Sequence, residues 1–246
     1  KSKEKEITFS YQRILGTLIL YRGLKNIIFY IEANKYIYHL HEYVLGRMIT
    51  FTLHDSNKYN TIGFQHGPSS FKLLLYKNSV NELPNKNNNF LNSVPIPNSV
   101  LAENKQSAEV YLNSGFRNVK VLEQVPRLSY LYDIKLNKHR NISLIVSGLH
   151  DFELVYNSTL KIIKDNPRNK FIFKPHPKSK INFEVYPLPK NAKYSKLHIK
   201  TLLVKAKSVY GSYSSVLSEA MYLKIKVNII DCPGTVDLSS ISETNL

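Results

Sequence analysis

Short apolar runs alternate with segments of helical periodicity along most of the chain. Seven runs predict strands: Asn26–Ile31, Thr61–Phe64, Val119–Leu122, Ile142–Ser147, Lys170–Phe173, Ser208–Gly211 and Lys226–Ile230. Three segments predict helices: Lys35–Met48, Phe152–Asn166 and Ser214–Leu223. Such alternation is typical of βα units around a mostly parallel sheet. The pattern therefore predicts an α/β protein.

The predicted elements fall into two sets, which separate near Glu123–Asn141. Within the first set, Pro84–Ser99 is rich in Asn and Pro and has no periodicity, which predicts an exposed loop. No internal repeat is visible. We therefore expect two domains, at residues 1–125 and 126–246.

Polar motifs follow three of the predicted strands. They are Gln65-His66-Gly67, Lys174-Pro175-His176-Pro177 and Gly211-Ser212-Tyr213-Ser214-Ser215. In open parallel sheets, ligands bind at the carboxyl ends of the strands. The three motifs are thus the first candidates for a functional site.

The stretch FKPHP ends the strand predicted at Lys170–Phe173. Prolines on both sides of His176 stiffen the backbone and fix the direction of the imidazole. An imidazole and the Lys174 ammonium can both donate to a phosphate. A histidine bonded to a neighbouring loop explains the motif equally well, so both interpretations stay open.

The small-residue loop Gly211–Ser215 leads into the helix predicted at Ser214–Leu223. Serines at a helix start are good N-caps, which is the simpler explanation. The same geometry also suits a phosphate, because free N–H groups and the positive end of the helix dipole lie there. Glu219, one turn further on, is either a ribose ligand or a solvated helix residue.

Candidates for proton transfer come from three places. They are His66, Glu32 after the strand predicted at Asn26–Ile31, and Asp151 at a helix start, where acidic residues are also common for dipole reasons. If Glu32 and His66 follow neighbouring strands, they share one cleft. The histidines show no metal-ligand spacing, and Walker A, GxGxxG, HExxH and GxSxG motifs are absent, so no metal and no cofactor are expected.

A formal net charge of +16 makes the chain strongly basic. The lysines are spread out rather than packed into a tract, and no nucleic-acid-binding signature is visible, so an anionic membrane or acceptor is a better partner than nucleic acid. A biased genome composition would also produce such a charge. The single Cys232 excludes internal disulfides, and no apolar run reaches the roughly 20 residues of a membrane span. We expect a cytoplasmic protein, with peripheral contact to the inner membrane as an option.

The order of the motifs resembles bacterial glycosyltransferases that use CMP-activated sugars. KPHP and the later Gly-Ser-Ser loop with Glu219 are similar to the HP and SS motifs of sialyl-, polysialyl- and Kdo transferases, which have a GT-B fold of two Rossmann-type domains. Tyr30–Asn34, Ile62–Gly67 and Asn104–Phe116 resemble segments of surface-carbohydrate biosynthesis proteins. The similarity extends from about Tyr30 to Ile230, and it implies that the first domain lacks its opening strands. The acidic motif that supplies the base in several sialyltransferases has no match here.

The resemblance implies a role for each motif. The donor nucleotide of a CMP-linked nonulosonic acid or Kdo-type sugar would be held by eight residues: Lys174, His176, Pro177, Gly211, Ser212, Ser214, Ser215 and Glu219. The acceptor, a surface polysaccharide or lipopolysaccharide, would lie on the first domain near Asn34, Gln65 and Gly67. The alternatives are a CDP-glycerol- or UDP-sugar-dependent transferase, a sugar-nucleotide 2-epimerase, and a basic protein that binds glycan, membrane or nucleic acid.

Overall fold

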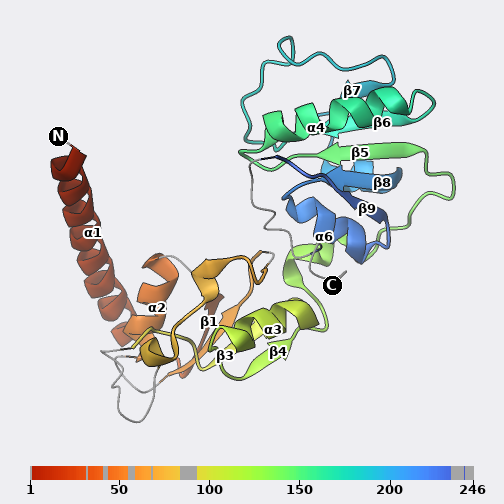
Figure 1. The fold of residues 1–246 in the computed structure, drawn as a ribbon. Helices are drawn as coiled ribbons and strands as arrows, with labels where there is room; N and C mark the ends of the chain where they lie inside the picture. Colours follow the sequence, from red (N-terminus) through yellow and green to blue (C-terminus); the bar gives the residue numbers. More distant parts are fainter. Residues whose placement is uncertain are drawn as a thin grey trace. The chain divides into compact units, whose positions relative to one another are not determined.

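The computed structural model describes residues 2–31, 33–40, 44–54, 59–67, 69–83, 93–233 and 241 of the chain (Figure 1). These residues form two compact units. The first comprises Lys1–His66 and Leu73–Glu123, and the second comprises Gly67–Lys72 and Gln124–Leu246. Each unit contains one parallel sheet.

The sheet of the first unit has four strands in the order β1-β2-β3-β4. All neighbouring pairs are parallel. Along the chain the elements are α1 (Ser2–Tyr30), β1 (Lys35–His39), α2 (Val44–His54), β2 (Asn60–Phe64), the 3-10 turns at Leu74–Tyr76 and Val80–Glu82, β3 (Ser99–Ala102), α3 (Lys105–Asn113) and β4 (Val119–Val121).

The sheet of the second unit has five strands in the order β7-β6-β5-β8-β9. Its elements are a 3-10 helix at Pro126–Leu131, β5 (Ile142–Val146), α4 (Phe152–Asp165), β6 (Lys170–Lys174), β7 (Ala192–Tyr194), α5 (Ile199–Leu203), β8 (Ala206–Gly211), α6 (Ser215–Tyr222) and β9 (Lys226–Ile229). The chain first builds outward from β5 to β7 and then returns to the other side of β5 with β8. The order therefore reverses between β5 and β8, and in this class of sheet ligands bind at that switch point.

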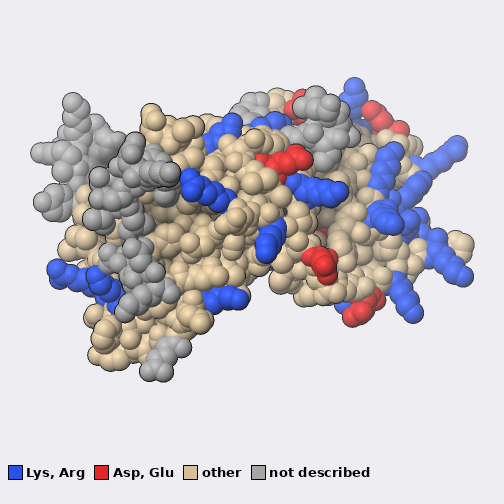
Figure 2. Space-filling model, turned by 90° about the horizontal axis from the view of Figure 1, so that it is seen from below, with Lys and Arg blue, Asp and Glu red and all other residues tan. Residues whose placement is uncertain are grey.

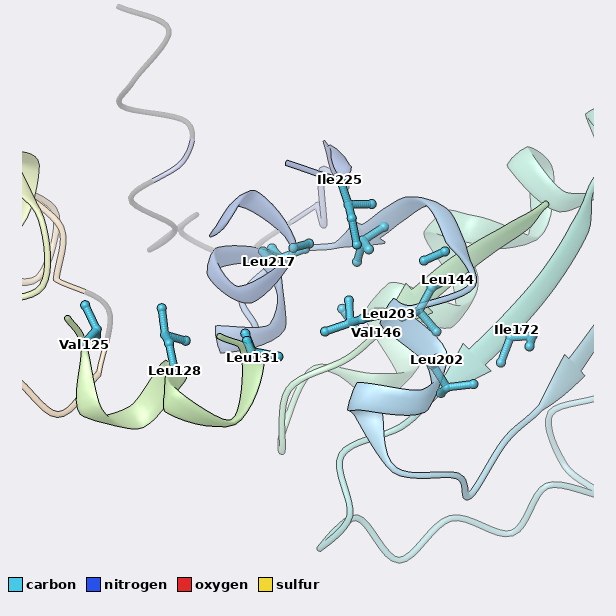
Figure 3. Close-up of a cluster of buried hydrophobic side chains, with 13 residues drawn as sticks. Val125, Leu128, Leu131, Leu144, Val146, Ile172, Leu202, Leu203, Leu217 and Ile225 are labelled. Carbon is cyan, nitrogen blue, oxygen red and sulfur yellow. The ribbon is translucent and has the colours of Figure 1, made fainter. Parts of the chain in front are cut away.

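Helices cover both faces of the second sheet, so its central strands are apolar on both sides. Leu144 and Val146 of β5 join one core cluster, to which α5 and α6 contribute Leu202 and Leu217 (Figure 3). Ile145 points to the opposite face. There it packs with the aromatic residues of β6 and with the buried side of α4, which are Phe171, Phe173, Phe152, Val155, Tyr156 and Ile163. The continuous apolar runs ISLIV and KFIFK follow from this double burial.

Most of the strands predicted from the sequence are confirmed. The structure contains β2, β4, β5, β6, β8 and β9 within one or two residues of the expected bounds, and α4 and α6 likewise. The prediction of an α/β protein with parallel sheets is confirmed by the pairing of every strand.

Two predictions near the start of the chain are wrong. Asn26–Ile31 is not a strand, because residues 26–30 form the last turns of α1. A short apolar run has no period that separates a strand from a helix. Ile28 is 9% exposed, and α1 packs on α2, where the rings of Tyr21 and Phe51 lie 5.6 Å apart.

Lys35–Met48 is not one helix. Lys35–His39 is β1, paired in parallel with β2, and α2 begins only at Val44. The Tyr36-Ile37-Tyr38 alternation fits a strand with one face against the unit. Two strands and two α-helices carried no prediction, β3, α3, β7 and α5, and neither did the 3-10 helices. The predicted Pro84–Ser99 loop lies outside the described residues from 84 to 92, and its last residue, Ser99, begins β3.

Candidate functional site

A cavity of about 660 Å³ lies at the carboxyl ends of β5, β6, β8 and β9 in the second unit. Its lining comes from residues 148–151, His176, residues 212–215 and residues 229–232. The first and third of these segments follow β5 and β8, so the cavity lies at the switch point of the sheet. Five predicted site residues meet here: Asp151, His176, Ser212, Ser214 and Ser215.

His176 is held in one orientation by its own loop. The backbone N–H of Lys178 donates to His176 Nδ1 at 3.2 Å. In the neutral ring the proton therefore resides on Nε2, which makes Nε2 a hydrogen-bond donor. The Ser179 backbone N–H donates to the His176 carbonyl at 2.9 Å, and its hydroxyl donates to the Leu149 carbonyl at 3.3 Å. The loop after β6 is thus tied to the loop after β5, and the imidazole lines the cavity between them.

The N-terminus of α6 forms another wall of the cavity. Ser214 is the N-cap, and its hydroxyl accepts from the Val216 backbone N–H at 3.4 Å. Ser215, the first residue of the helix, is exposed at the cavity. The positive end of the α6 dipole and the hydroxyl of Ser215 thus face the same space as His176. Capping by Ser214 and anion binding at this helix end are compatible, since they use different groups.

Asp151 and Ser212 connect the loops after β5 and β8. The Ser212 hydroxyl donates to Asp151 Oδ2 at 2.5 Å. Asp151 is the N-cap residue of α4 but makes no side-chain cap, and its buried Oδ1 has no hydrogen-bond partner. A Cβ atom at Gly148 would lie 2.9 Å from the Tyr213 carbonyl oxygen and 3.1 Å from Asp151 Oδ1. Glycine at 148 is therefore what allows the two loops to approach.

Cys232 also lines the cavity, and the sequence analysis assigned it no site role. It follows β9, is 4% exposed and lies near Ser212, Ser158 and Asp151. Burial raises the pKa of its thiol. No sequence signal distinguished it from an ordinary core cysteine, because only the sheet order places β9 beside β8.

Four predicted donor-site residues are not among the cavity lining. Lys174 is the half-buried last residue of β6, and Pro177 is exposed. Gly211 ends β8, where a Cβ atom would lie 2.9 Å from the Val146 carbonyl oxygen, so it permits close packing of β8 on β5. Glu219 is 7% exposed, which corrects the idea of a solvated residue. Burial of Tyr130, and then the Glu219 carboxylate beside it, raise the pKa of Tyr130, and Glu219 Oε2 has no hydrogen-bond partner.

In the first unit, His66 follows β2 and lies beside His39, the last residue of β1. The rings of His39 and His66 are stacked with centroids 5.8 Å apart. His66 Nδ1 lies 3.1 Å from the Leu40 carbonyl oxygen, and because a carbonyl can only accept, Nδ1 carries the proton. The lone pair of the neutral ring is therefore on Nε2, which is the arrangement of a general base. His39 was missed because its strand was predicted as a helix.

The residues expected to bind the acceptor do not gather at one edge of the first sheet. Asn34 directly precedes β1, whereas Gln65 and Gly67 follow β2. In a parallel sheet these positions lie at opposite edges, about 16 Å apart for a five-residue strand at 3.3 Å per residue. A strand at Asn26–Ile31 would have placed Asn34 after a strand, but those residues are the end of α1. Glu32 lies outside the described residues.

Gln65 has a structural role. Its Nε2 donates to the Ser107 hydroxyl at 3.1 Å, its Oε1 accepts from the Glu103 backbone N–H at 2.9 Å, and it is 3% exposed. The side chain thus joins β2 to the start of α3. A direct contact of this buried amide with an acceptor is not expected.

Two further observations concern ions and membranes. Among the described residues, no group of three or more His, Cys, Asp and Glu side chains is placed to hold a metal ion. None of the described helices combines the length and the apolar character that crossing a bilayer requires.

Comparison of the sequence with known protein families finds no match, and comparison with curated proteins finds none either. Solved structures do match. A UDP-GlcNAc 2-epimerase from Neisseria meningitidis, bound to UDP-GlcNAc, is 14% identical with a TM-score of 0.52 over 86% of this chain and 62% of that chain. The calicheamicin glycosyltransferase CalG4 is 11% identical with a TM-score of 0.55 over 99% of this chain and 72% of that chain. The fold is of the GT-B type.

A glycosyltransferase from Rickettsia africae is similar in the same way. It is 12% identical, with a TM-score of 0.53 over 89% of this chain and 63% of that chain. The chain thus spans a little under two thirds of the epimerase and of the Rickettsia protein. At these identities the similarity is one of fold, so the site residues are assigned from their own geometry.

Proposed function

We propose that the protein is a glycosyltransferase that binds a nucleotide sugar in the cavity of the second unit. The single observation behind this proposal is the convergence of His176, Ser215 and the N-terminus of α6 at the β5/β8 switch point. A donor imidazole, a hydroxyl and a helix N-terminus are the groups that recognise a phosphate. The fold supports the proposal, because transferases are among the solved structures that share it.

Glycosyl transfer from a nucleotide sugar is accelerated by groups that stabilise the leaving phosphate. The acceptor hydroxyl attacks the anomeric carbon, the bond from that carbon to the phosphate oxygen breaks, and the nucleotide leaves with added negative charge. His176 Nε2–H and the N-terminus of α6 suit that charge, and a single preorganised donor is typically worth about 3 kcal/mol of barrier. Ser212 and Ser214 would complete the nucleotide site, with Lys174 adding positive charge behind it, whereas Glu219 is buried outside the cavity lining.

Asp151 suits a different part of the substrate. A carboxylate repels a phosphate but accepts from a hydroxyl, and Asp151 lines the cavity. We assign Asp151 to a hydroxyl of the sugar or of the acceptor, where it serves as the general base. His66, with its lone pair on Nε2, is the second candidate base, and the first unit would carry the acceptor glycan.

The donor that we favour is a CMP-linked nonulosonic acid or Kdo-type sugar, on the strength of the KPHP and Gly-Ser-Ser motifs. The acceptor would be a surface polysaccharide or lipopolysaccharide, and no metal ion would take part. A UDP sugar is the competing donor, since the epimerase with the same fold is bound to UDP-GlcNAc. A 2-epimerase activity would use the same cavity without an acceptor.

We further propose that the protein works in the cytoplasm with peripheral contact to an anionic membrane, through α1. Between residues 14 and 31 this helix and the residue after it carry no acidic residue. Leu18 and Phe29 are 53% and 81% exposed, and Arg22 lies on the same helical face by its spacing. Exposed apolar side chains beside cations favour contact with the headgroup region of an anionic bilayer.

Nucleotide titration tests the donor site. Thermal stability is followed with CMP, CDP and UDP for the unaltered protein, for His176→Ala and for a His139→Ala control on an exposed loop. A ligand at 100 times its Kd should add about 2.7 kcal/mol of stability. We expect CMP to stabilise the protein and the control, but not His176→Ala. His176→Gln should recover part of the effect, since its amide nitrogen replaces Nε2.

The other outcomes are equally informative. Stronger stabilisation by UDP or CDP than by CMP would agree with a transferase that uses a different donor nucleotide. Equal stabilisation of His176→Ala and the unaltered protein would contradict the proposed phosphate site. Cleavage of the preferred nucleotide sugar only when a glycan acceptor is added would separate a transferase from an epimerase.

A further inference from the structure

Positive charge is concentrated at the amino edge of the second sheet, opposite the edge that holds the cavity described above. Lys170 begins β6 and Lys226 begins β9, while Lys193 and Lys207 are the second residues of β7 and β8. Arg140 lies two residues before β5. Figure 2 shows Lys and Arg side chains gathered on the right of the view, on the side where the strands of this sheet begin in Figure 1.

The strand register makes these charges neighbours. Ile142 of β5 is opposite Lys170 of β6, and Phe171 of β6 is opposite Ala192 of β7. Adjacent strands lie about 4.8 Å apart, so cations at successive strand beginnings form a row along the edge. Of the acidic residues, only Asp165 lies in the segments 135–142, 164–171, 190–193, 205–207 and 224–226.

The carboxyl edge of the same sheet has no such excess. The segments that follow its strands, at residues 147–151, 175–178, 195–198, 212–215 and 230–233, hold two lysines and two aspartates. Those four residues are Lys178, Lys196, Asp151 and Asp231. A general bias of composition would charge both edges alike. The asymmetry therefore belongs to the amino edge itself.

A second cavity of about 630 Å³ opens within this edge. It is lined by Arg168, Lys170, Lys190 and Lys193, which we call the cationic rim, together with Asn141, Asn169 and apolar groups. The side chain of Asn191 fixes its shape by donating to the carbonyls of residues 163, 166 and 169. A volume of a few hundred Å³ is that of a small-molecule site.

Arg140 lies two residues before β5 and is not among the residues that line this cavity. Its Nη1 is buried and has no hydrogen-bond partner, and it directly precedes the lining residue Asn141. Arg140 thus adds positive charge to this edge of the sheet, whereas contact with a ligand falls to the lining residues. Amides and cations around a hollow are groups that recognise hydroxyls and carboxylates or phosphates of a sugar residue.

We propose that the cationic rim binds an acidic glycan, a carbohydrate chain with a carboxylate or phosphate on its repeating unit. The cavity binds one charged sugar residue of the glycan. The next sugar residues along the glycan are bound by Lys205, Lys207, Lys224 and Lys226. The identity of the chain rests on the proposed function, because transfer of an acidic sugar lengthens a polymer of this kind. The residues that line this cavity include no exposed large hydrophobic side chain. Nucleic-acid bases would therefore find no surface on which to stack, and a bilayer would find no apolar anchor.

Binding of polysialic acid to the full chain tests the rim. Affinity is measured at 0.05 M and 0.15 M salt for the unaltered protein, for Lys170→Gln/Lys193→Gln and for a control, Lys161→Gln/Lys196→Gln. The control removes the same charge from exposed sites on α4 and after β7. We expect the rim variant to lose about tenfold in affinity, the control less than about twofold, and neutral dextran not to bind.

Three results would overturn the inference. They are no binding of polysialic acid by the unaltered protein, equal losses in the rim variant and the control, and tighter rim-dependent binding of anionic vesicles or single-stranded DNA. The thermal stability of both variants without ligand checks that they fold. The nucleotide titration stays separate, since neither variant changes the first cavity. If the glycan binds through the cationic rim but no nucleotide stabilises the protein, the proposed transferase function is refuted and the proposed glycan site stands.

Discussion

The Ser212 hydroxyl and the Asp151 carboxylate are joined by a hydrogen bond of 2.5 Å across the β5/β8 switch point. A hydroxyl that donates to an ionised oxygen at this distance forms a strong, charge-assisted bond. It fixes Oδ2 and leaves the buried Oδ1 without a partner. The two residues come from loops 61 positions apart, so the pair exists only in the folded chain.

Replacing Asp151 should reduce activity more than replacing Ser212. We expect Asp151→Asn to lower kcat by a factor of about 10² to 10⁴, which is typical of the loss of a general base. Ser212→Ala should cost less, because the carboxylate remains. A double-mutant cycle on kcat/KM should show coupling of about 0.5–3 kcal/mol, the range for residues in contact. Additive effects would mean that the 2.5 Å bond does not orient the base.

Gly211→Ala should destabilise the second unit. The new Cβ would lie 2.9 Å from both Val146 Cγ2 and the Val146 carbonyl oxygen, and the central strand β5 cannot move away. Such overpacking costs about 1–3 kcal/mol, measured by urea denaturation. Gly67→Ala is the matched control. Nothing lies within 4 Å of its Cβ, so its effect should stay within about 0.5 kcal/mol.

Cys232 provides a built-in probe of the first cavity, since it is the single cysteine of the chain. Burial raises its pKa, so at pH 8 less thiolate is present than in an ordinary thiol. Labelling by a small alkylating reagent should keep accelerating above pH 9, whereas the urea-unfolded chain should level off near its ordinary pKa of about 8.5. A bound nucleotide should slow the reaction, and an unchanged rate would place the nucleotide elsewhere.

The same shift has a consequence for stability. A thiol whose folded pKa is raised stabilises the fold fully below the unfolded pKa, and that stabilisation is lost as pH rises through the folded pKa. Thermal stability should therefore fall above about pH 8.5, and Cys232→Ser should fall less steeply. A parallel decline in both proteins would assign the loss to other groups.

Leu18→Glu should weaken the proposed membrane contact of α1. The change removes an exposed apolar side chain and adds a negative charge, so we expect about tenfold weaker co-sedimentation with phosphatidylglycerol vesicles. Leu112→Glu, on the exposed side of α3, makes the same change at a position of similar exposure, 54% against 53%. Equal losses in both variants would argue for a general charge effect instead.

The second unit was largely predictable from its sequence. Strands buried on both faces are continuous apolar runs, and ISLIV and KFIFK have the length and the flanking polar residues that mark them. The positions of His176 and of the serines after β8 followed from the rule that sites lie at strand carboxyl ends. The first unit was less predictable, because Asn26–Tyr30 and Lys35–His39 have apolar patterns that fit either a helix or a strand.

The sequence by itself determined the α/β class, the parallel sheets and the motif that brings His176 to a strand end, since these depend on local apolar patterns and on turn residues. The tertiary structure decided the strand order, and with it three relationships. It joined Ser212 to Asp151, placed Cys232 in the cavity, and gathered Lys170 and Lys193 at one edge. Which strands become neighbours depends on long-range packing, which no window of sequence contains.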